Sequence, residues 1–248
     1  MFSAIFKSIF KRRDVSILLA FSLLPLVTPF FMGNQNIDTM ATSGFTSNLF
    51  SFLVGALDTQ YKLIIPTLIM AFIVSSVFRD EIDNGIMFLY KDINRNHIFK
   101  AKMKGLFLLY FIYFALSLFV GVVTYYAILI PKYNLQMKIL PSHSLDFENN
   151  LLVLLTTIAL NLLTISLIAW IAISKKTLVA VLYGVLFTLL SMIAPMLKTF
   201  RYVYPNSYAE LIKELSFGKS FLIATILSIV YFSILYLLAK NKFKKIEF

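Results

Sequence analysis

The chain has 248 residues, of which 59% are hydrophobic and 14% charged, and its mean hydropathy is +0.83. This composition excludes a soluble domain, whose surface must be largely polar, and predicts an integral membrane protein. The net charge of +11 does not indicate nucleic-acid binding, because the basic residues lie in short blocks beside apolar runs. The absence of cysteine excludes disulfides, thiolate catalysis and cysteine-ligated metals.

Residues 1–14 predict an amphipathic helix that lies in the membrane interface. Its apolar side chains recur at helical spacing, and its basic side chains lie on the other face or just beyond it. Residues 15–32 follow without a charge, and at about 1.5 Å per residue they cross most of a bilayer core. We interpret this run as an uncleaved first span, kinked at Pro25 and Pro29, because it exceeds the roughly 7–15 apolar residues of a secretory signal.

Five further apolar segments predict membrane spans, so that residues 1–248 form one all-α transmembrane domain with six spans. These spans cover about residues 61–78, 105–130, 151–173, 177–197 and 220–239. The segments at 33–60, 131–150 and 198–219 are expected to face outward. The last of them predicts a short amphipathic helix at 207–215, either on the outer leaflet or as a cap on the bundle.

The basic residues divide unequally between the two predicted sides of the membrane. Sixteen of the 23 lysines and arginines fall before the first span, in the 79–104 loop, in the turn at 175–176 or after the sixth span. Because basic residues are enriched on the cytoplasmic side, this bias places both termini and the 79–104 loop in the cytoplasm.

Apart from Lys62 at the outer end of the second span, the predicted spans contain no Asp, Glu, Lys, Arg or His. Proton-coupled carriers and voltage sensors need such groups inside the membrane, so these classes are disfavoured. Thr156, Asn161 and Thr164 give the fourth span a polar character. We favour interhelical hydrogen bonding for these three residues, and a lining of a transport pathway is the alternative. No pattern of catalytic, metal-binding or cofactor-binding residues is present, which argues against an enzyme.

Two pairs of small residues are spaced four apart inside the predicted spans. Ser117 with Gly121, and Ala180 with Gly184, leave little side-chain volume on one face of a helix. Such pairs allow neighbouring helices to approach closely, so we expect tight helix packing at both places.

The loop at 79–104 is the only long, highly charged stretch between apolar segments, and it contains a short apolar run from Ile86 to Tyr90. Five residues cannot cross a bilayer, which takes about 20 in a helix. The run must therefore be buried in the membrane surface, under other loops of the chain or in a partner protein.

The whole layout resembles the permease subunits of ABC-2 type transporters. In that family the second span ends with a glutamate four residues before a glycine, followed by a short apolar helix, an arginine and a lysine. This chain has these features in the same order: Glu81, Gly85, Ile86, Met87, Phe88, Leu89, Tyr90, Arg95 and Lys102. It departs from the pattern at Ile93 and Asn94, where the family usually has a proline, and at Ile86, where a threonine is frequent.

The resemblance implies that residues 85–92 form a cytoplasmic coupling helix that docks on a separate ATP-binding subunit, to which ATP and Mg²⁺ bind. It also implies a second permease subunit, identical or related, in a bacterial plasma membrane. The expected activity is export of hydrophobic or amphipathic cargo, such as antimicrobial or cytolytic peptides or a lipophilic antibiotic.

Other interpretations of the same loop stay open. Residues 86–90 fit equally on the inner leaflet of the membrane. The chain is alternatively a scaffold or sensor whose loop binds a cytoplasmic signalling protein, and an intramembrane enzyme is the third candidate.

Overall fold

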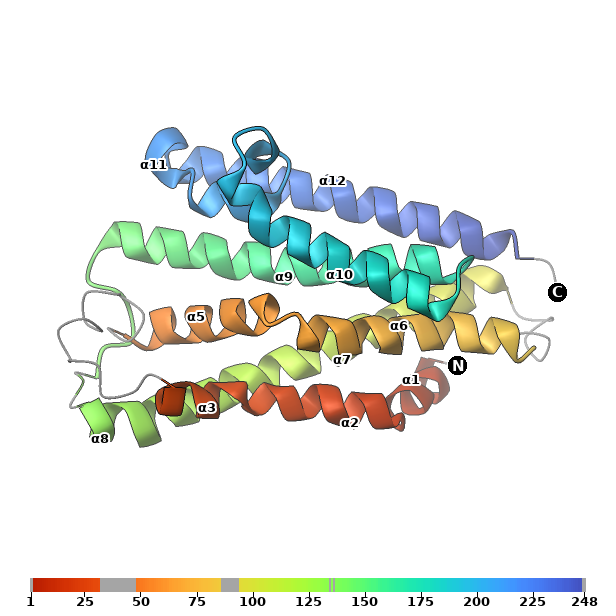
Figure 1. The fold of residues 1–248 in the computed structure, drawn as a ribbon, viewed down its shortest axis with the longest axis horizontal. Coiled ribbons are helices and arrows are strands. Elements are labelled where there is room, and N and C mark those ends of the chain that lie inside the picture. The colour runs from red at the N-terminus through yellow and green to blue at the C-terminus, as the bar shows by residue number, and fades with distance from the viewer. Residues whose placement is uncertain (1, 32–47, 86–93, 134, 136, 247–248) are drawn as a thin grey trace.

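A computed structural model describes residues 2–31, 48–85, 94–133, 135 and 137–246. Within these ranges the regular elements are all helical, and they form an elongated bundle (Figure 1). The α-helices are α1 (Phe2–Phe10), α2 (Arg13–Ala20), α3 (Leu24–Phe31), α5 (Leu49–Lys62), α6 (Ile65–Asp83), α7 (Arg95–Thr124), α8 (Ile130–Tyr133), α9 (Ser144–Ala172), α10 (Thr177–Ile193), α11 (Ile212–Leu215) and α12 (Phe217–Lys244). The 3-10 segments are η1 (Phe21–Leu23), η4 (Ala194–Met196), η5 (Phe200–Tyr202) and η6 (Pro205–Ala209), and η3 (Tyr125–Leu129) is π-helical.

Four helical runs in the described part of the chain are long and apolar enough to cross a membrane. They are Arg95–Tyr133, Ser144–Ala172, Thr177–Met196 and Phe217–Lys244, and the pair α5 and α6 makes a fifth if it forms one span. The expectation of an all-helical fold is therefore confirmed for the described residues, and the length and apolar composition of these runs agree with a membrane protein. These runs correspond to the last four predicted spans. Three of them begin before the predicted limits, α7 by ten residues, whereas the run Thr177–Met196 lies within the predicted 177–197.

The N-terminal segment is helical as predicted but is divided into shorter pieces. α1 ends before Lys11, so the helix covers 2–10 rather than 1–14, and its buried Ile9 packs toward α7. Residues 13–31 form α2, η1 and α3 in succession. The 3-10 turn of η1 comes directly before Pro25, whose ring nitrogen cannot donate to the carbonyl of Phe21. The α-helix is therefore interrupted by a 3-10 segment close to Pro25, where a kink was predicted.

The prediction of an outer loop at 33–60 is wrong for residues 49–60, which form most of α5. Asn48 caps this helix by accepting a hydrogen bond from the backbone N–H of Ser51 at 2.8 Å. Phe52 is fully buried, and the polar Gln60 is 3% exposed. Polar residues suggested a loop here, but Ser51 and Gln60 are buried inside the bundle, where Gln60 has hydrogen-bond partners from other helices.

α5 and α6 are separated by a sharp break and meet at an angle of 62°. Ile64 has a φ of 62°, and the N–H of Ile65 donates to the carbonyl of Leu63 at 2.6 Å, which closes a tight γ-turn. Pro66 follows in the first turn of α6, where its missing donor is tolerated. The predicted second span at 61–78 therefore begins inside one helix and continues in another.

The segment before α12 packs against the bundle rather than standing apart from it. Instead of one helix at 207–215, the structure has η6 and the short α11. Tyr208, Leu211 and Ile212 are buried with Leu152 of α9 and Ala224 of α12. Of the two predicted placements, this contact corresponds to a cap on the bundle.

The two small-residue pairs lie at close helix contacts. A Cβ atom added to Gly184 would be 2.7 Å from Cδ1 of Ile168, which joins α10 to α9. One added to Gly121 would be 2.5 Å from Cδ2 of Leu53, which joins α7 to α5. The expectation of tight packing at these positions is confirmed.

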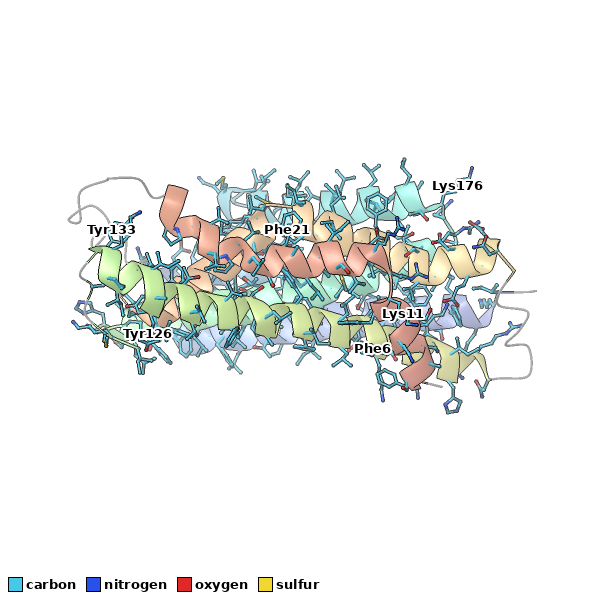
Figure 2. The ribbon with its side chains drawn as sticks, turned by 90° about the horizontal axis from the view of Figure 1, so that it is seen from below. Phe6, Lys11, Phe21, Tyr126, Tyr133 and Lys176 are labelled. Carbon is cyan, nitrogen blue, oxygen red and sulfur yellow. The ribbon has the colours of Figure 1, made fainter. Side chains whose placement is uncertain are left out.

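Both termini lie at the same end of the bundle (Figure 1). The ends of α6 and α7 that flank residues 86–93, and the turn between α9 and α10, are at that end too. Figure 2 shows Lys11 and Lys176 there, with Tyr126 and Tyr133 toward the opposite end. The fold thus gathers the basic segments, which are separate in sequence, around one end of the molecule.

Candidate functional site

The predicted docking residues divide into those that the structure describes and those that it does not. Ile86, Met87, Phe88, Leu89 and Tyr90 lie outside the described residues. The structure describes the four residues that flank them, Glu81, Gly85, Arg95 and Lys102. The candidate site is therefore built from the chain segments on either side of residues 86–93.

Glu81 and Lys102 form a buried ion pair between α6 and α7. The Nζ of Lys102 lies 2.8 Å from Oε2 of Glu81 and donates to the backbone carbonyl of Val77 at 2.8 Å. The Lys102 side chain is 1% exposed, and Nζ is 5.2 Å from the ring centre of Phe78 and 5.7 Å from that of Phe243. A buried ammonium needs these partners because its desolvation is costly.

Arg12, between α1 and α2, is held against α6. Its guanidinium lies 3.8 Å from the carboxylate of Asp80 and donates to the hydroxyl of Ser76. A longer bond of 3.5 Å runs to the Ser76 carbonyl. The N-terminal segment is therefore tied to α6 one turn from Glu81.

The C-terminal end of α12 is tied to the start of α7. Arg95 donates to the backbone carbonyls of Lys244 at 2.8 Å and Ile246 at 2.5 Å. Beneath these bonds, the rings of Phe78, Phe99 and Phe243 pack with centres 5.7 to 6.0 Å apart. Because all three rings are fully buried, α6, α7 and α12 share one aromatic core at this end.

Gly85 ends α6 directly before the undescribed residues. Its φ is 66°, and its N–H donates to the carbonyl of Ile82 at 3.2 Å. Glycine occupies such a left-handed position at the end of a helix without the steric cost of a side chain. The glycine that carries part of the family resemblance thus has a structural reason to be there.

We refer to Arg12, Asp80, Glu81, Arg95 and Lys102 as the anchor cluster. It joins the α1–α2 segment, the end of α6, the start of α7 and the end of α12 around the two ends of the 86–93 connection. Sequence reasoning found Glu81, Arg95 and Lys102. It missed Arg12 and Asp80 as a pair, because nothing in the sequence indicates that residues 68 positions apart meet.

The three residues considered for a pathway lie on α9 and bond first to their own helix. Thr156, Asn161 and Thr164 each donate to the carbonyl four residues earlier, at 2.7 to 2.9 Å. Thr156 lines a pocket of about 500 Å³, and Asn161 lines a separate small cavity of about 20 Å³. Thr164 is buried. Thr164 also bonds to Tyr61 of α5 and Asn161 to Tyr110 of α7, as expected for interhelical hydrogen bonding. The structure thus places two of the three beside internal space but does not join them in one channel.

Further bonds between helices involve residues that sequence reasoning did not single out. The Tyr61 hydroxyl is 2.7 Å from Oγ of Ser191, and the Tyr113 hydroxyl donates to Oε1 of Gln60 at 3.2 Å. Gln60 in turn donates to the carbonyl of Phe21 at 3.4 Å. These bonds hold α5, at its break, against α7, α10 and the first helical run.

Comparison with protein-family models, curated proteins and solved structures finds no match. The fold and the anchor cluster by themselves define the class: a helical protein with runs long and apolar enough to cross a membrane, whose charged residues tie four chain segments together at the end that holds both termini.

Proposed function

We propose that this chain is the membrane-spanning subunit of an ATP-driven exporter of the ABC-2 type. The observation that carries the proposal is the anchor cluster, whose bonds surround both ends of the connection expected to dock on the ATP-binding subunit. A force applied to residues 86–93 acts first on the end of α6 and the start of α7. Because these helices are bonded to the α1–α2 segment and to α12, they move together with the rest of that end.

The proposal includes six spans with both termini in the cytoplasm. Residues 13–31 supply the first span, α5 with α6 the second, and the four long helical runs the others. The chain carries no nucleotide-binding motif, so ATP and Mg²⁺ belong to the separate subunit. Two such chains, identical or related, make the working transporter in a bacterial plasma membrane.

The proposed cargo is hydrophobic or amphipathic, such as an antimicrobial or cytolytic peptide or a lipophilic antibiotic. Support comes from the apolar segments predicted as spans, the second at 61–78, which carry no charged side chain except Lys62; this disfavours transport of strongly hydrated ions. These segments also contain no carboxylate that could couple transport to protons, so an external energy source fits them better.

The test is the substitution Phe88→Asp, with Phe88→Leu as the matched apolar control. A charge in an apolar docking groove is expected to abolish co-purification of an ATP-binding subunit and the ATPase activity of the complex. Phe88→Leu should keep both. Thermal unfolding of the purified variants checks that the bundle is intact. Normal co-purification and ATPase activity of folded Phe88→Asp would contradict docking through this segment.

The scaffold or sensor alternative also predicts a partner on residues 86–93. It differs in the partner: a kinase or regulator without ATP-driven transport, instead of an ATP-binding transport subunit. Mass spectrometry of the protein lost from Phe88→Asp but kept by Phe88→Leu therefore separates the two functions.

A further inference from the structure

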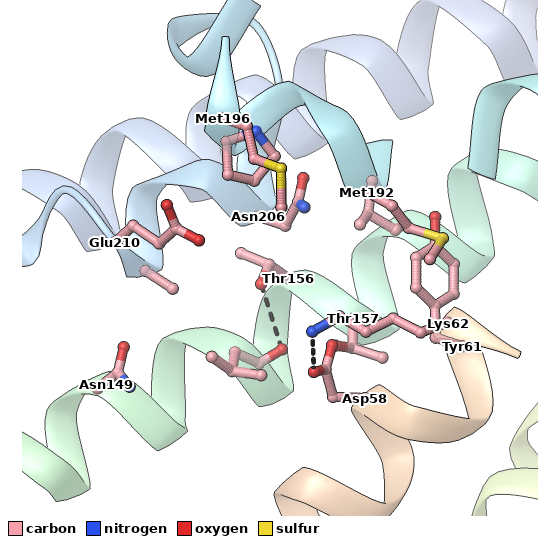
Figure 3. A pocket seen from close by; sticks show the side chains of 14 residues that line it. Asp58, Tyr61, Lys62, Asn149, Thr156, Thr157, Met192, Met196, Asn206 and Glu210 are labelled. Atoms are coloured by element: carbon pink, nitrogen blue, oxygen red, sulfur yellow. Dashed lines mark hydrogen bonds and ion pairs between the residues drawn. The ribbon is translucent and has the colours of Figure 1, made fainter. Parts of the chain in front are cut away.

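A second feature of the molecule lies away from the anchor cluster, between α5, α9, the end of α10 and η6. It is the pocket of about 500 Å³, a size suited to a small organic ligand. Its wall is mixed in character (Figure 3). Part of the wall consists of charged, amide and hydroxyl-bearing side chains, and its apolar surface comes from Val153, Leu160, Met192, Pro195, Met196 and Ala209.

The charged groups of the pocket have an excess of negative charge. Asp58 and Lys62 form an ion pair at 2.5 Å on one side. Glu210 lies across the pocket from this pair, as Figure 3 shows, and makes no ion pair with any residue that the structure describes. Lys62 is thus neutralised by Asp58, and the carboxylate of Glu210 is left to attract a cation.

Asn206 offers a further acceptor in the same wall. Its Nδ2 donates to the backbone carbonyl of Ser191 at 2.8 Å, which sets the orientation of the amide. Its Oδ1 is then buried and has no hydrogen-bond partner among the described residues. A buried acceptor without a partner is uncommon and costs free energy, and a ligand that carries an N–H group would satisfy it.

The apolar side of the pocket suits the body of such a ligand. Met192 and Met196 are flexible and polarisable, so they adapt to ligands of different shape. The ring of Tyr61 contributes to the same wall, with its hydroxyl held by Ser191. An apolar surface beside a lone carboxylate matches a molecule that is apolar at one end and carries an amine at the other.

We propose that this pocket binds an amphipathic organic amine in its protonated form. The ammonium lies by Glu210 and the carbonyl oxygen of the Asn206 side chain, and the apolar body lies against Met192 and Met196. This inference goes beyond the proposed function, because it concerns binding by this chain alone and does not depend on an ATP-binding partner.

The experiment uses the purified full chain in nanodiscs of zwitterionic lipid and dansylcadaverine, a fluorescent amphipathic amine, as the probe. Its N-acetylated form, which has the same body without the charge, is the matched ligand control. Fluorescence anisotropy titrations give the dissociation constant of each. The amine is expected to bind more tightly than the acetylated probe.

Two substitutions with opposite expected effects test the assignment of charge. Glu210 is exposed, so Glu210→Gln should weaken amine binding about two- to fivefold, the range for an exposed ion pair. Lys62→Gln removes the cation and should strengthen amine binding about twofold or more. Asp146→Asn, an exposed carboxylate that does not line the pocket, should change nothing.

The proposal is overturned if both probes bind equally, since this would mean partition into lipid. It is also overturned if Glu210→Gln leaves the amine affinity unchanged while the protein stays folded. Opposite shifts for Glu210→Gln and Lys62→Gln, absent with the acetylated probe, would support it. A loss of folding cannot produce a gain in affinity, so the Lys62→Gln result is independent of stability.

Discussion

Lys102 shows how a single residue can require a specific arrangement of helices. Its ammonium is buried and has three kinds of partner: a carboxylate, a backbone carbonyl and two aromatic faces. A buried ion pair seldom adds net stability, but the loss of one member leaves an uncompensated charge. Glu81 is therefore important mainly because the buried ammonium of Lys102 requires a counter-ion.

We predict that Glu81→Gln lowers the free energy of unfolding by about 3 kcal/mol, because Lys102 stays buried without its counter-ion. The double variant Glu81→Gln/Lys102→Met should recover most of this loss. Asp83→Asn, which breaks an exposed ion pair with Arg79, serves as control and should cost less than about 1 kcal/mol. Thermal unfolding of the purified proteins measures all three, and a double variant no better than Glu81→Gln would contradict the explanation.

At the scale of elements, the break between α5 and α6 is the most unusual feature. Ile64 is β-branched and adopts a positive φ, a conformation that costs on the order of 1–3 kcal/mol and persists only where the surroundings impose it. The neighbouring Tyr61 is bonded to Ser191 across the bundle and lines the pocket. The strained turn directly follows the end of α5, and residues at this end form part of the pocket wall.

Close packing between helices gives a second prediction at this scale. Gly184→Val should lower stability by about 1–3 kcal/mol, because even a Cβ would be 2.7 and 2.9 Å from atoms of Ile168. Gly218→Val is the matched control, since no atom lies within 4 Å of a Cβ added there, and it should be nearly neutral. The unfolding temperatures of the two variants measure the two losses of stability. Equal losses would contradict the explanation that close packing at Gly184 destabilises the variant.

At the scale of the whole molecule, the distribution of charge is the main property. The basic segments at the two termini, beside residues 86–93 and in the turn at 175–176 all lie at one end of the molecule, which is therefore strongly basic. The pocket lies away from this end. In the proposed orientation the basic end contacts the cytoplasm, and the pocket lies toward the outer side.

The orientation can be tested by labelling, because the chain has no cysteine of its own. Ser142→Cys should react with a membrane-impermeant maleimide in intact cells, whereas Lys245→Cys should react only after permeabilisation. Both positions are exposed in the structure, so access depends on the membrane alone. The reverse pattern would invert the topology. Labelling of both positions in intact cells would contradict the odd number of spans, three, that the proposal places between them.

The sequence by itself determined the properties that depend on composition and on local pattern. Hydropathy predicted a helical membrane protein and the last four spans, because a bilayer selects long apolar helices whatever their neighbours. Small residues predicted close helix contacts, and Glu81, Arg95 and Lys102 were singled out by the order of residues that resembles the ABC-2 permease pattern. Only the tertiary structure decided that Arg12 meets Asp80 and that residues 49–60 are helical. It also decided that the second span is broken at Ile64. The shared pocket of Asp58, Asn206 and Glu210 is likewise visible only in the tertiary structure. These features depend on contacts between residues far apart in the chain, and such contacts satisfy polar groups that a local pattern assigns to loops.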